Sequence, residues 1–242
     1  EPRLLDVDHV VLCAGQEPLC SLQQPLEQAG IRVQLIGGAK LALGLDRSLS
    51  AGALTVIANI GDDFRHLGLA ISPDIDTLVY TLADLVNPDT GWGRRDETWH
   101  FMAELARLGG ETWFRLGDRD LAMHVERTRR LDAGETLATV TRETCQHLGI
   151  GSRIVPASDS RVPTRVVTEA GVLAFQDYFV RRRCAPVVSA LRFVGADEAR
   201  PPATAMAALG DPGLRALLIA PSNPWLSIDP MLAIPDLRAA LE

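Results

Sequence analysis

The strongest constraint on the fold of this 242-residue chain is a regular alternation of short apolar runs with segments of helical spacing. The apolar runs have the length of buried strands, and the first two run into glycine turns. In chain order, the first elements predicted are a strand at 7–15, a helix at 17–30, a strand at 31–36, a helix at 41–50 and a strand at 53–60. This alternation predicts an α/β fold with a doubly wound parallel sheet.

The rest of the chain divides into a helical part and a strand-rich part. Apolar residues at helical spacing predict three helices, at 96–110, 118–134 and 136–149. Strands are predicted at 152–158, 164–180, 188–195 and 213–224, with "EAG" as a hairpin turn in the second. We therefore expect residues 1–242 to form a single α/β domain that carries a helical insertion at about 95–150.

Composition limits the classes of function. The formal net charge of −7 argues against a sequence-independent nucleic-acid binder, which needs clustered cations. No apolar run approaches the roughly 18 residues of a membrane span, and the N-terminal residues lack the pattern of a signal peptide. The four cysteines form no CxxC pair, which argues against a zinc site or a disulfide framework. We expect a cytoplasmic protein without nucleic-acid or membrane partners.

Four aspartates gather where two apolar segments converge. Asp62 and Asp63 follow the predicted strand 53–60, and Asp74 and Asp76 would point the same way in an extended segment. Carboxylates that converge from two loops repel one another unless a cation lies between them, and such oxygen ligands suit Mg²⁺. The alternative from spacing alone is that one aspartate caps a helix and the others are solvated.

Other polar loops follow apolar runs and would meet at the carboxyl ends of the strands, where ligands bind in parallel sheets. Gly37-Gly38-Ala39-Lys40 could present N–H groups to a phosphate, or could be an ordinary tight turn. In Pro221-Ser222-Asn223-Pro224, the Ser and Asn side chains could bind a polar head group, or the segment could be an ordinary turn. In residues 114–120, Arg115 or Arg119 could hold an anion, and Asp118 or Asp120 could cap the following helix.

Seven sequence blocks in order resemble the 2-phospho-L-lactate transferase family of coenzyme F-420 biosynthesis, which includes phosphoenolpyruvate transferases. The resemblance covers about residues 37–242. Its blocks are "GGAKLALGL", "NIGDDFRHLGLAISPDIDTLVYTL", "GWGRRDETW", "WFRLGDRDLAMHVERT", "IVPASDS", "FQDYFVRRR" and "APSNPWLSIDPMLAIP".

The resemblance implies a Rossmann-like parallel sheet with a helical insertion and a Mg²⁺-dependent reaction. In that reaction, 2-phospho-L-lactate or phosphoenolpyruvate moves from its guanosine diphosphate-activated form to the deazaflavin precursor Fo, and GMP leaves. The small-molecule partners would be Fo and the guanosine-linked phosphoacid, and a homodimer is implied. The implied residue roles are metal binding and catalysis by Asp62 and Asp76, Fo contact by Asp76 and Arg115, phosphate binding by Gly37, Gly38 and Lys40, and guanosine contact by Ser222 and Asn223.

Two departures from the family pattern leave further hypotheses open. Residues 7–39 resemble the C-terminal end of 2,4-dienoyl-CoA reductase-type flavoenzymes, and Gln34-Leu35-Ile36 stands where the family has its first glycine pair. Residues 1–36 are thus atypical of the family, although the strand at 31–36 could replace its first strand. The family also continues beyond the end of this sequence. The alternatives to a transferase are an impaired Fo- or nucleotide-binding relic and an NAD(P)H or flavin oxidoreductase fragment.

Overall fold

A computed structural model describes residues 9–13, 28, 32–36 and 38–242. The helix predicted at 17–30 and Gly37 of the predicted phosphate loop lie outside the described residues, apart from residue 28. The α/β class is confirmed, since helices and a parallel strand pair make up the centre of the molecule. Among the described helices, none combines the length and apolarity needed to cross a membrane.

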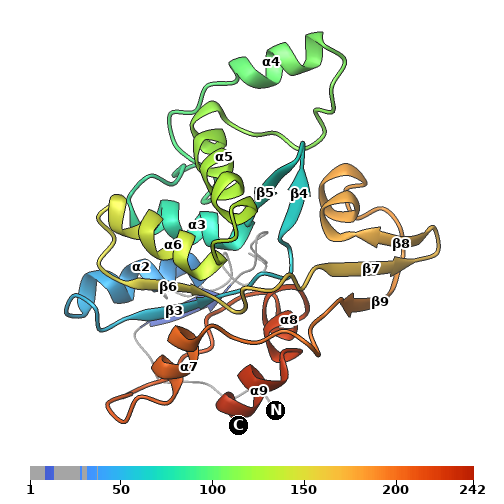
Figure 1. Ribbon diagram of the computed structural model, residues 1–242. Coiled ribbons are helices and arrows are strands. Elements are labelled where there is room, and N and C mark those ends of the chain that lie inside the picture. Colours follow the sequence, from blue (N-terminus) through green and yellow to red (C-terminus); the bar gives the residue numbers. More distant parts are fainter. Residues whose placement is uncertain (1–8, 14–27, 29–31, 37) are drawn as a thin grey trace.

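The centre of the fold is the parallel pair of β3 (Thr55–Ala58) and β6 (Arg153–Pro156), which fulfils the prediction of parallel strands. Helices lie on both sides of this pair (Figure 1). The helices on one side are α2 (Gly38–Ser48), α3 (Pro73–Leu82) and α6 (Leu137–His147). On the other side are α7 (Ala203–Leu209), α8 (Asp229–Leu232) and α9 (Pro235–Leu241). Buried apolar side chains from both helical layers, including Ile75, Val79, Ile234 and Leu237, join Ile154 of β6 in one core.

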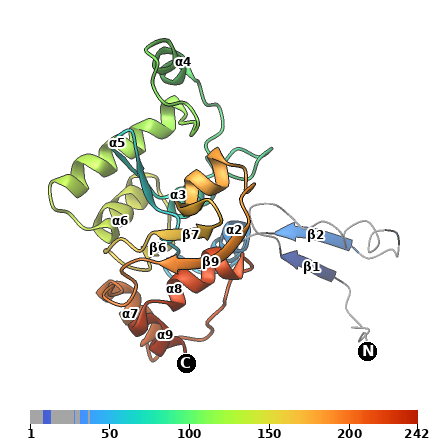
Figure 2. The same ribbon diagram turned by 90° about the vertical axis from the view of Figure 1, so that its right-hand side faces the viewer.

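The two N-terminal strands do not join this sheet. β1 (His9–Cys13) and β2 (Arg32–Ile36) pair with each other in parallel and project from the body of the molecule beside α2 (Figure 2). The expectation that the strand at 31–36 takes the place of the family's first strand is therefore wrong for this structure. The hydrogen-bonded partner of β2 is β1, and that of β3 is β6.

The predicted helical part contains α4 (His100–Arg107), α5 (Asp118–Asp132) and α6, as expected. The starts of α4 and α5 cap each other. The carboxylate of Glu97 accepts hydrogen bonds from the N–H groups of the second and third residues of α5, at 2.9 and 2.8 Å. The carboxylate of Asp118 accepts from the first two N–H groups of α4, at 3.0 Å each. Asp118 thus caps a helix, but α4 rather than the predicted α5.

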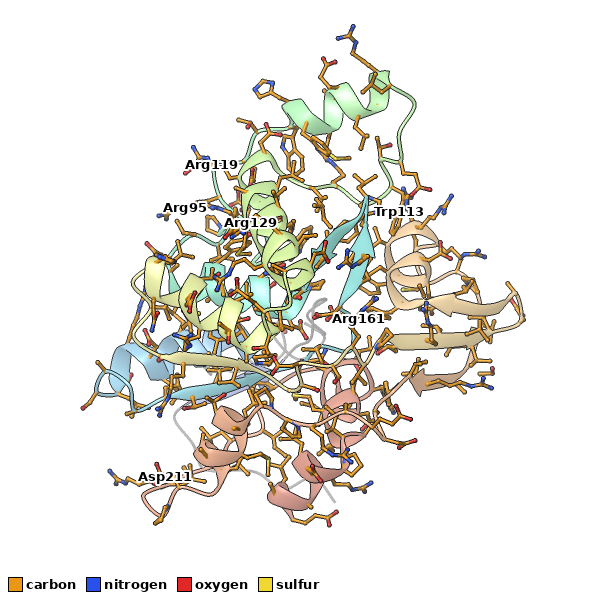
Figure 3. All side chains as sticks on the ribbon, in the orientation of Figure 1. Arg95, Trp113, Arg119, Arg129, Arg161 and Asp211 are labelled. Carbon is orange, nitrogen blue, oxygen red and sulfur yellow. The ribbon has the colours of Figure 1, made fainter. Side chains whose placement is uncertain are left out.

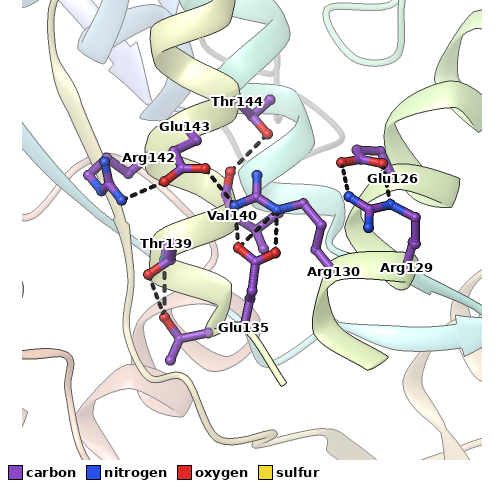
Figure 4. Close-up of polar contacts among 10 residues, drawn as sticks. Glu126, Arg129, Arg130, Glu135, Thr139, Val140, Arg142, Glu143 and Thr144 are labelled. Carbon is purple, nitrogen blue, oxygen red and sulfur yellow. Dashed lines mark hydrogen bonds and ion pairs between the residues drawn. The ribbon is translucent and has the colours of Figure 1, made fainter. Parts of the chain in front are cut away.

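Ion pairs fasten the end of α5 to α6 (Figure 4). The largely buried guanidinium of Arg130 binds Glu135, with an Nε to Oε1 distance of 3.0 Å, and Glu143 of α6, with an Nη2 to Oε2 distance of 2.6 Å. Arg142 adds a second contact to Glu143 at 2.8 Å. These hydrogen bonds raise the pKa of Arg130 and lower the pKa values of both glutamates.

A second, antiparallel sheet has the strand order β8-β7-β9. The strands β7 (Thr164–Thr168) and β8 (Gly171–Ala174) form the predicted hairpin, and β9 (Val188–Phe193) pairs with the other edge of β7. A shorter hairpin joins β4 (Phe64–His66) to β5 (Leu69–Ile71), and Trp113 lies at its tip (Figure 3).

Two predicted strand segments adopt other structures. The strand predicted at 164–180 ends at Ala174, because pairing with β7 ends there, and the chain continues as the π-helical turn η2 (Asp177–Arg181). The strand predicted at 213–224 forms neither strand nor helix up to residue 223. Its apolar side chains Leu217, Leu218 and Ile219 are exposed, so apolar content alone was a misleading strand signal there.

Candidate active site

The site begins at the end of β3, where Asn59 connects three parts of the chain. Its side-chain amide donates to Asp74 Oδ2 at 2.8 Å and to the carbonyl oxygen of Leu226 at 3.2 Å. Its carbonyl Oδ1 accepts from the N–H of Gly61 at 2.9 Å. The side chain is buried, so these bonds satisfy polar groups that would otherwise be costly to bury. They hold the β3 turn, the start of α3 and the C-terminal segment together.

Asp62 is buried, and its neighbour Asp63 is half-buried. Asp62 is 5% exposed, and its Oδ1 has no hydrogen-bond partner among the described residues. Asp63 Oδ2 accepts from the Ser72 hydroxyl at 2.8 Å, while its Oδ1 also lacks a described partner. Burial first, and then the charges of neighbouring carboxylates including Asp74, raise the pKa of Asp62 well above its ordinary range. Burial likewise raises the pKa values of Asp63 and Asp74. Buried negative charge of this kind is stabilised by a cation.

The expectation that Asp74 and Asp76 lie on an extended segment is wrong. Both belong to the first turn of α3, where Pro73 occupies a favoured first helical position and acidic residues suit the helix dipole. Two residues apart on a helix, they face different partners. Asp74 binds Asn59, and Asp76 pairs through both carboxylate oxygens with the guanidinium of Arg127, which is 4% exposed.

The ion pair of Asp76 and Arg127 belongs to a larger buried network. His124 Nδ1 lies 3.8 Å from Asp76 Oδ2, and His124 Nε2 lies 3.1 Å from Asp120 Oδ2. The hydroxyl of Tyr80 donates to the other oxygen of Asp120. Burial opposes the ionisation of Asp120, but the contacts with His124 and Tyr80 and the charge of Arg127 outweigh it and lower the pKa of Asp120. This network fixes Asp76 firmly in place.

The predicted phosphate loop lies beside the predicted guanosine loop. A Cβ atom built on Gly38, at the start of α2, would lie 3.5 Å from the carbonyl oxygen of Pro221 and 3.6 Å from the Cβ of Ala220. Lys40 and Ser222 are exposed. The side chain of Asn223 accepts hydrogen bonds from the N–H groups of Trp225 and Leu226, at 3.0 and 3.1 Å, and so caps η3 (Pro224–Ile228). Gly38, at the start of α2, thus lies beside the loop at 220–223, and the N-terminus of a helix is a common binding place for a phosphate.

Arg115 lies apart from these groups. Its exposed guanidinium stacks on the ring of Trp99 at 4.1 Å, near the start of α4. Among the described residues, no hydrogen bond or ion pair connects Arg115 with the carboxylates. The structure therefore brings Asp62 together with Asp74 and Asp76, and Gly38 together with the loop at 220–223, while Arg115 stacks on Trp99 beside the start of α4.

The sequence analysis missed Arg127 and His124. A usable signal existed, because Asp120, His124 and Arg127 stand at helical spacing and form a polar stripe on one face of α5. A polar stripe on a helix predicts either a solvated face or a buried network. Asp76, the partner of Arg127, is 51 residues away in the sequence. Local spacing could therefore not decide between a solvated helix face and a buried network.

The donor groups at Asp62 fit a Mg²⁺ ion. No group of three or more histidine, cysteine or acidic side chains in the described part of the chain is arranged to hold a metal by itself. Mg²⁺ commonly uses only one or two carboxylates and takes its other ligands from phosphates and water. Asp62 offers a buried oxygen without a described partner. Asp76 already neutralises Arg127, so any ion that binds Asp76 shares its carboxylate with that guanidinium.

A small cavity of mixed polar and apolar lining adjoins Asp63. Its volume is about 80 Å³, and Asp63, Ser72, Asp159 and Arg161 are among the residues that line it. Arg161 lies just below the β4–β5 hairpin in Figure 3. Asp159 accepts a hydrogen bond from the N–H of Ala138 at 2.8 Å and so also helps to anchor the start of α6.

Comparison with known proteins identifies the family. Residues 36–242 match the family described as "2-phospho-L-lactate transferase CofD". The chain is 42% identical over 228 residues to the phosphoenolpyruvate transferase of Mycobacterium leprae, a match that covers 85% of this chain and 68% of that protein. It is 42% identical over 211 residues to the phosphoenolpyruvate transferase of Streptomyces coelicolor, with 85% and 66% covered.

A solved structure supports the fold. The chain resembles a UPF0052-family protein from Bacillus halodurans with a TM-score of 0.55 and 14% sequence identity. The match covers 84% of this chain and 61% of that one, so the chain spans about three fifths of its structural neighbour.

The family and the relatives reported above are not named as oxidoreductases, and the family match begins at residue 36, so the resemblance of residues 7–39 to flavoenzymes receives no support. The relatives support the expectation of a transferase that acts on small molecules in coenzyme F-420 biosynthesis. The chain belongs to the 2-phospho-L-lactate transferase CofD family.

Proposed function

We propose that this chain transfers a phosphorylated three-carbon acid from a guanosine diphosphate-activated donor to the terminal ribityl hydroxyl of Fo, in a Mg²⁺-dependent reaction. The observation that carries the proposal is the buried Oδ1 of Asp62, which has no hydrogen-bond partner in the described part of the chain and lies among further carboxylates after β3. A catalytic role for such a group explains why the fold retains negative charge that burial and mutual repulsion disfavour.

Among the acids, phosphoenolpyruvate has the better support. The curated relatives with 41–42% identity to this chain are phosphoenolpyruvate transferases. We therefore expect the phosphoenolpyruvate donor to be used in preference to its 2-phospho-L-lactate counterpart, with dehydro-F-420-0 and GMP as the products.

Different residues bind the donor and the metal. The N–H groups at the start of α2, with Gly38 beside the 220–223 loop, bind the diphosphate, and Lys40 adds a positive charge. Asp62 would hold Mg²⁺ together with Asp76, whose orientation is set by its ion pair with Arg127. Bound Mg²⁺ would supply charge stabilisation at the diphosphate.

The transfer itself is an in-line displacement at phosphorus. The ribityl hydroxyl oxygen of Fo bonds to the phosphorus that carries the acid, while the bond from that phosphorus to the bridging oxygen breaks. GMP leaves with the electron pair, and the hydroxyl proton passes to solvent or to a nearby carboxylate. Because phosphoryl transfer needs little covalent chemistry from the protein, positioning and charge stabilisation supply most of the acceleration.

The test is a chromatographic assay of Fo conversion with each donor, with and without Mg²⁺. We expect turnover by the wild-type chain and a loss of at least about a hundredfold in Asp62→Asn, the scale reached when one group that stabilises transition-state charge is removed. The matched control is Asp211→Asn, which alters an exposed aspartate in the loop after α7 (Figure 3) and should leave turnover unchanged. Wild-type protein that binds both substrates without converting them would instead support the non-catalytic relic.

A further inference from the structure

Arg127 of α5 already binds one of the two carboxylates for which a metal-binding role is proposed. Its buried guanidinium donates from Nη1 to Asp76 Oδ2 at 3.2 Å and from Nη2 to Asp76 Oδ1. Nη1 also donates to the carbonyl oxygen of Ala70 in β5 at 3.4 Å, which gives the guanidinium a second anchor. Because arginine stays protonated in proteins, this contact places a permanent positive charge on Asp76.

Two other carboxylates that act on Asp62 also have protein partners. Asp74 accepts from the Asn59 amide, and Asp63 accepts through one oxygen from the Ser72 hydroxyl, both at 2.8 Å. In the described part of the chain, Oδ1 of Asp62 and Oδ1 of Asp63 are buried oxygens without a hydrogen-bond partner. Mg²⁺ demands near-octahedral coordination by oxygen. The protein alone therefore offers few uncommitted oxygens, and the other ligands have to come from water or from the donor.

The positive charge of Arg127 extends its effect beyond Asp76. Burial raises the pKa of Asp63, and the charge of Arg127 is among the effects that oppose this rise. A metal ion that binds among these carboxylates is therefore repelled by the guanidinium, and a buried site strengthens the repulsion between like charges. The diphosphate of the donor changes this balance, because it brings oxygen ligands and negative charge together.

We propose that Arg127 keeps the metal affinity of the donor-free site low, so that Mg²⁺ binds tightly only together with the diphosphate of the donor. The proposal rests on the proposed transferase function, because that function supplies the diphosphate. Arg127 acts through Asp76 and is thus a positioning residue. Its guanidinium competes with the metal for the Asp76 carboxylate, and the phosphate oxygens compensate for this competition with further ligands and negative charge.

A purely structural role for Arg127 predicts a different result. If the ion pair served only to stabilise the buried Asp76, its removal would loosen the site and leave the metal affinity unchanged or lower. Competition predicts that neutralising Arg127 raises the metal affinity of the donor-free protein, because Asp76 becomes available and a repelling charge is lost. Damage to the fold does not tighten metal binding, so the direction of the change separates the two roles.

The experiment measures Mn²⁺ affinity by electron paramagnetic resonance of the free ion. The full chain is titrated with and without GDP, whose diphosphate stands in for that of the donor, and a titration of GDP alone corrects for metal bound by the nucleotide. Arg127→Gln removes the charge but keeps an amide donor for Asp76, whereas Arg127→Lys keeps the charge. The matched control is Arg130→Gln, which alters a largely buried arginine of the same helix that pairs with Glu135 and Glu143 (Figure 4). Circular dichroism checks that each variant is folded at the temperature of the titration.

We expect the wild-type protein to bind Mn²⁺ at least about tenfold more tightly with GDP than without it, and Arg127→Gln to raise the donor-free affinity at least about tenfold, a change that one nearby charge can produce. Arg127→Lys and Arg130→Gln should keep the wild-type affinities. Three results would overturn the proposal: equal wild-type affinity with and without GDP, an unchanged or lower donor-free affinity in Arg127→Gln, or an equal rise in Arg127→Lys or Arg130→Gln. The first of these needs no variant, so it decides even if Arg127→Gln does not fold.

The wild-type turnover assay separates this proposal from the proposed function. Turnover together with an unchanged donor-free metal affinity in Arg127→Gln refutes only the role of Arg127. The expected metal affinities without turnover refute only the transferase.

Discussion

Gly61 is the position where the packing around the site can be tested most sharply. A methyl group added there would lie 2.7 and 2.8 Å from Cβ and Cγ of Pro230 and 3.0 Å from Oγ1 of Thr164. The proline ring is rigid and buried, so Gly61→Ala forces a shift of the backbone or of α8. Overpacking of this kind typically costs about 1–3 kcal/mol. We expect a loss of about 2 kcal/mol, which corresponds to a fall in Tm of roughly 4–8 °C for a chain of this size.

The matched control is Gly44→Ala. Gly44 lies within α2, and an added Cβ there would meet no atom within 4 Å. Alanine is favoured over glycine in a helix interior by about 1 kcal/mol, so the same substitution should raise the stability at this site. Urea unfolding followed by far-ultraviolet circular dichroism measures both changes as shifts in midpoint at constant slope. A Gly61→Ala midpoint equal to or above the wild-type value would refute the packing argument.

Three other predictions follow from charge and burial. Asp76→Asn leaves the buried guanidinium of Arg127 without its charged partner and should lower the free energy of unfolding in urea by about 3–5 kcal/mol. Asp62→Asn removes one of several neighbouring buried carboxylates and should raise the urea midpoint when EDTA is present. Equal losses of stability in the two variants would contradict the different surroundings of the two aspartates. The hydrogen bond from Arg130 lowers the pKa of Glu143 in the folded protein. The stabilisation that Glu143 provides is therefore complete above its ordinary pKa of 4.5, and it is lost as the pH falls through the lower pKa of the folded state. Glu143→Gln should thus lower Tm at neutral pH but not in strong acid, and a pH-independent difference would count against the ion pair. Burial raises the pKa of the Cys145 thiol to about 11, so iodoacetamide at about pH 8 should alkylate it only after unfolding; mass mapping that finds it modified in the folded protein would contradict this.

The sequence predicted the elements whose signals are local. The strand at β3, the helix α2, the helices between residues 100 and 147 and the β7–β8 hairpin all follow from periodicity and turn residues within a short window. The parallel pairing of β3 with β6 was also predictable, because the helices between these strands provide the long crossover that parallel neighbours need.

The errors occurred where a longer-range partner decides the structure. The apolar run at 213–224 resembles a strand, but a strand needs a hydrogen-bonding neighbour, and the described structure offers it none. At α3, Pro73 indicated a helix start, yet the alternation of Asp74 and Asp76 was interpreted as an extended segment. For the site, the clustering of acidic residues left two interpretations open, a metal site or capping and solvated carboxylates. The burial of Asp62 and Asp76 and the ion pair with Arg127 depended on contacts between distant segments.

The three hydrogen bonds of Asn59 also limit how early the site can form while the protein is being synthesised. The two strands of the parallel pair are complete once Pro156 has been made, but the carbonyl of Leu226, which Asn59 binds 167 positions along the chain, does not yet exist. At about 5–20 residues per second, the ribosome needs roughly 4–14 s to reach it. During this interval Asp62, Asp74 and Asp76 have already been synthesised, but the segment that Asn59 binds through Leu226 has not. The hydrogen bonds of Asn59 can therefore be completed only after Leu226 has been made, and a substrate that needs this arrangement can bind only from then on.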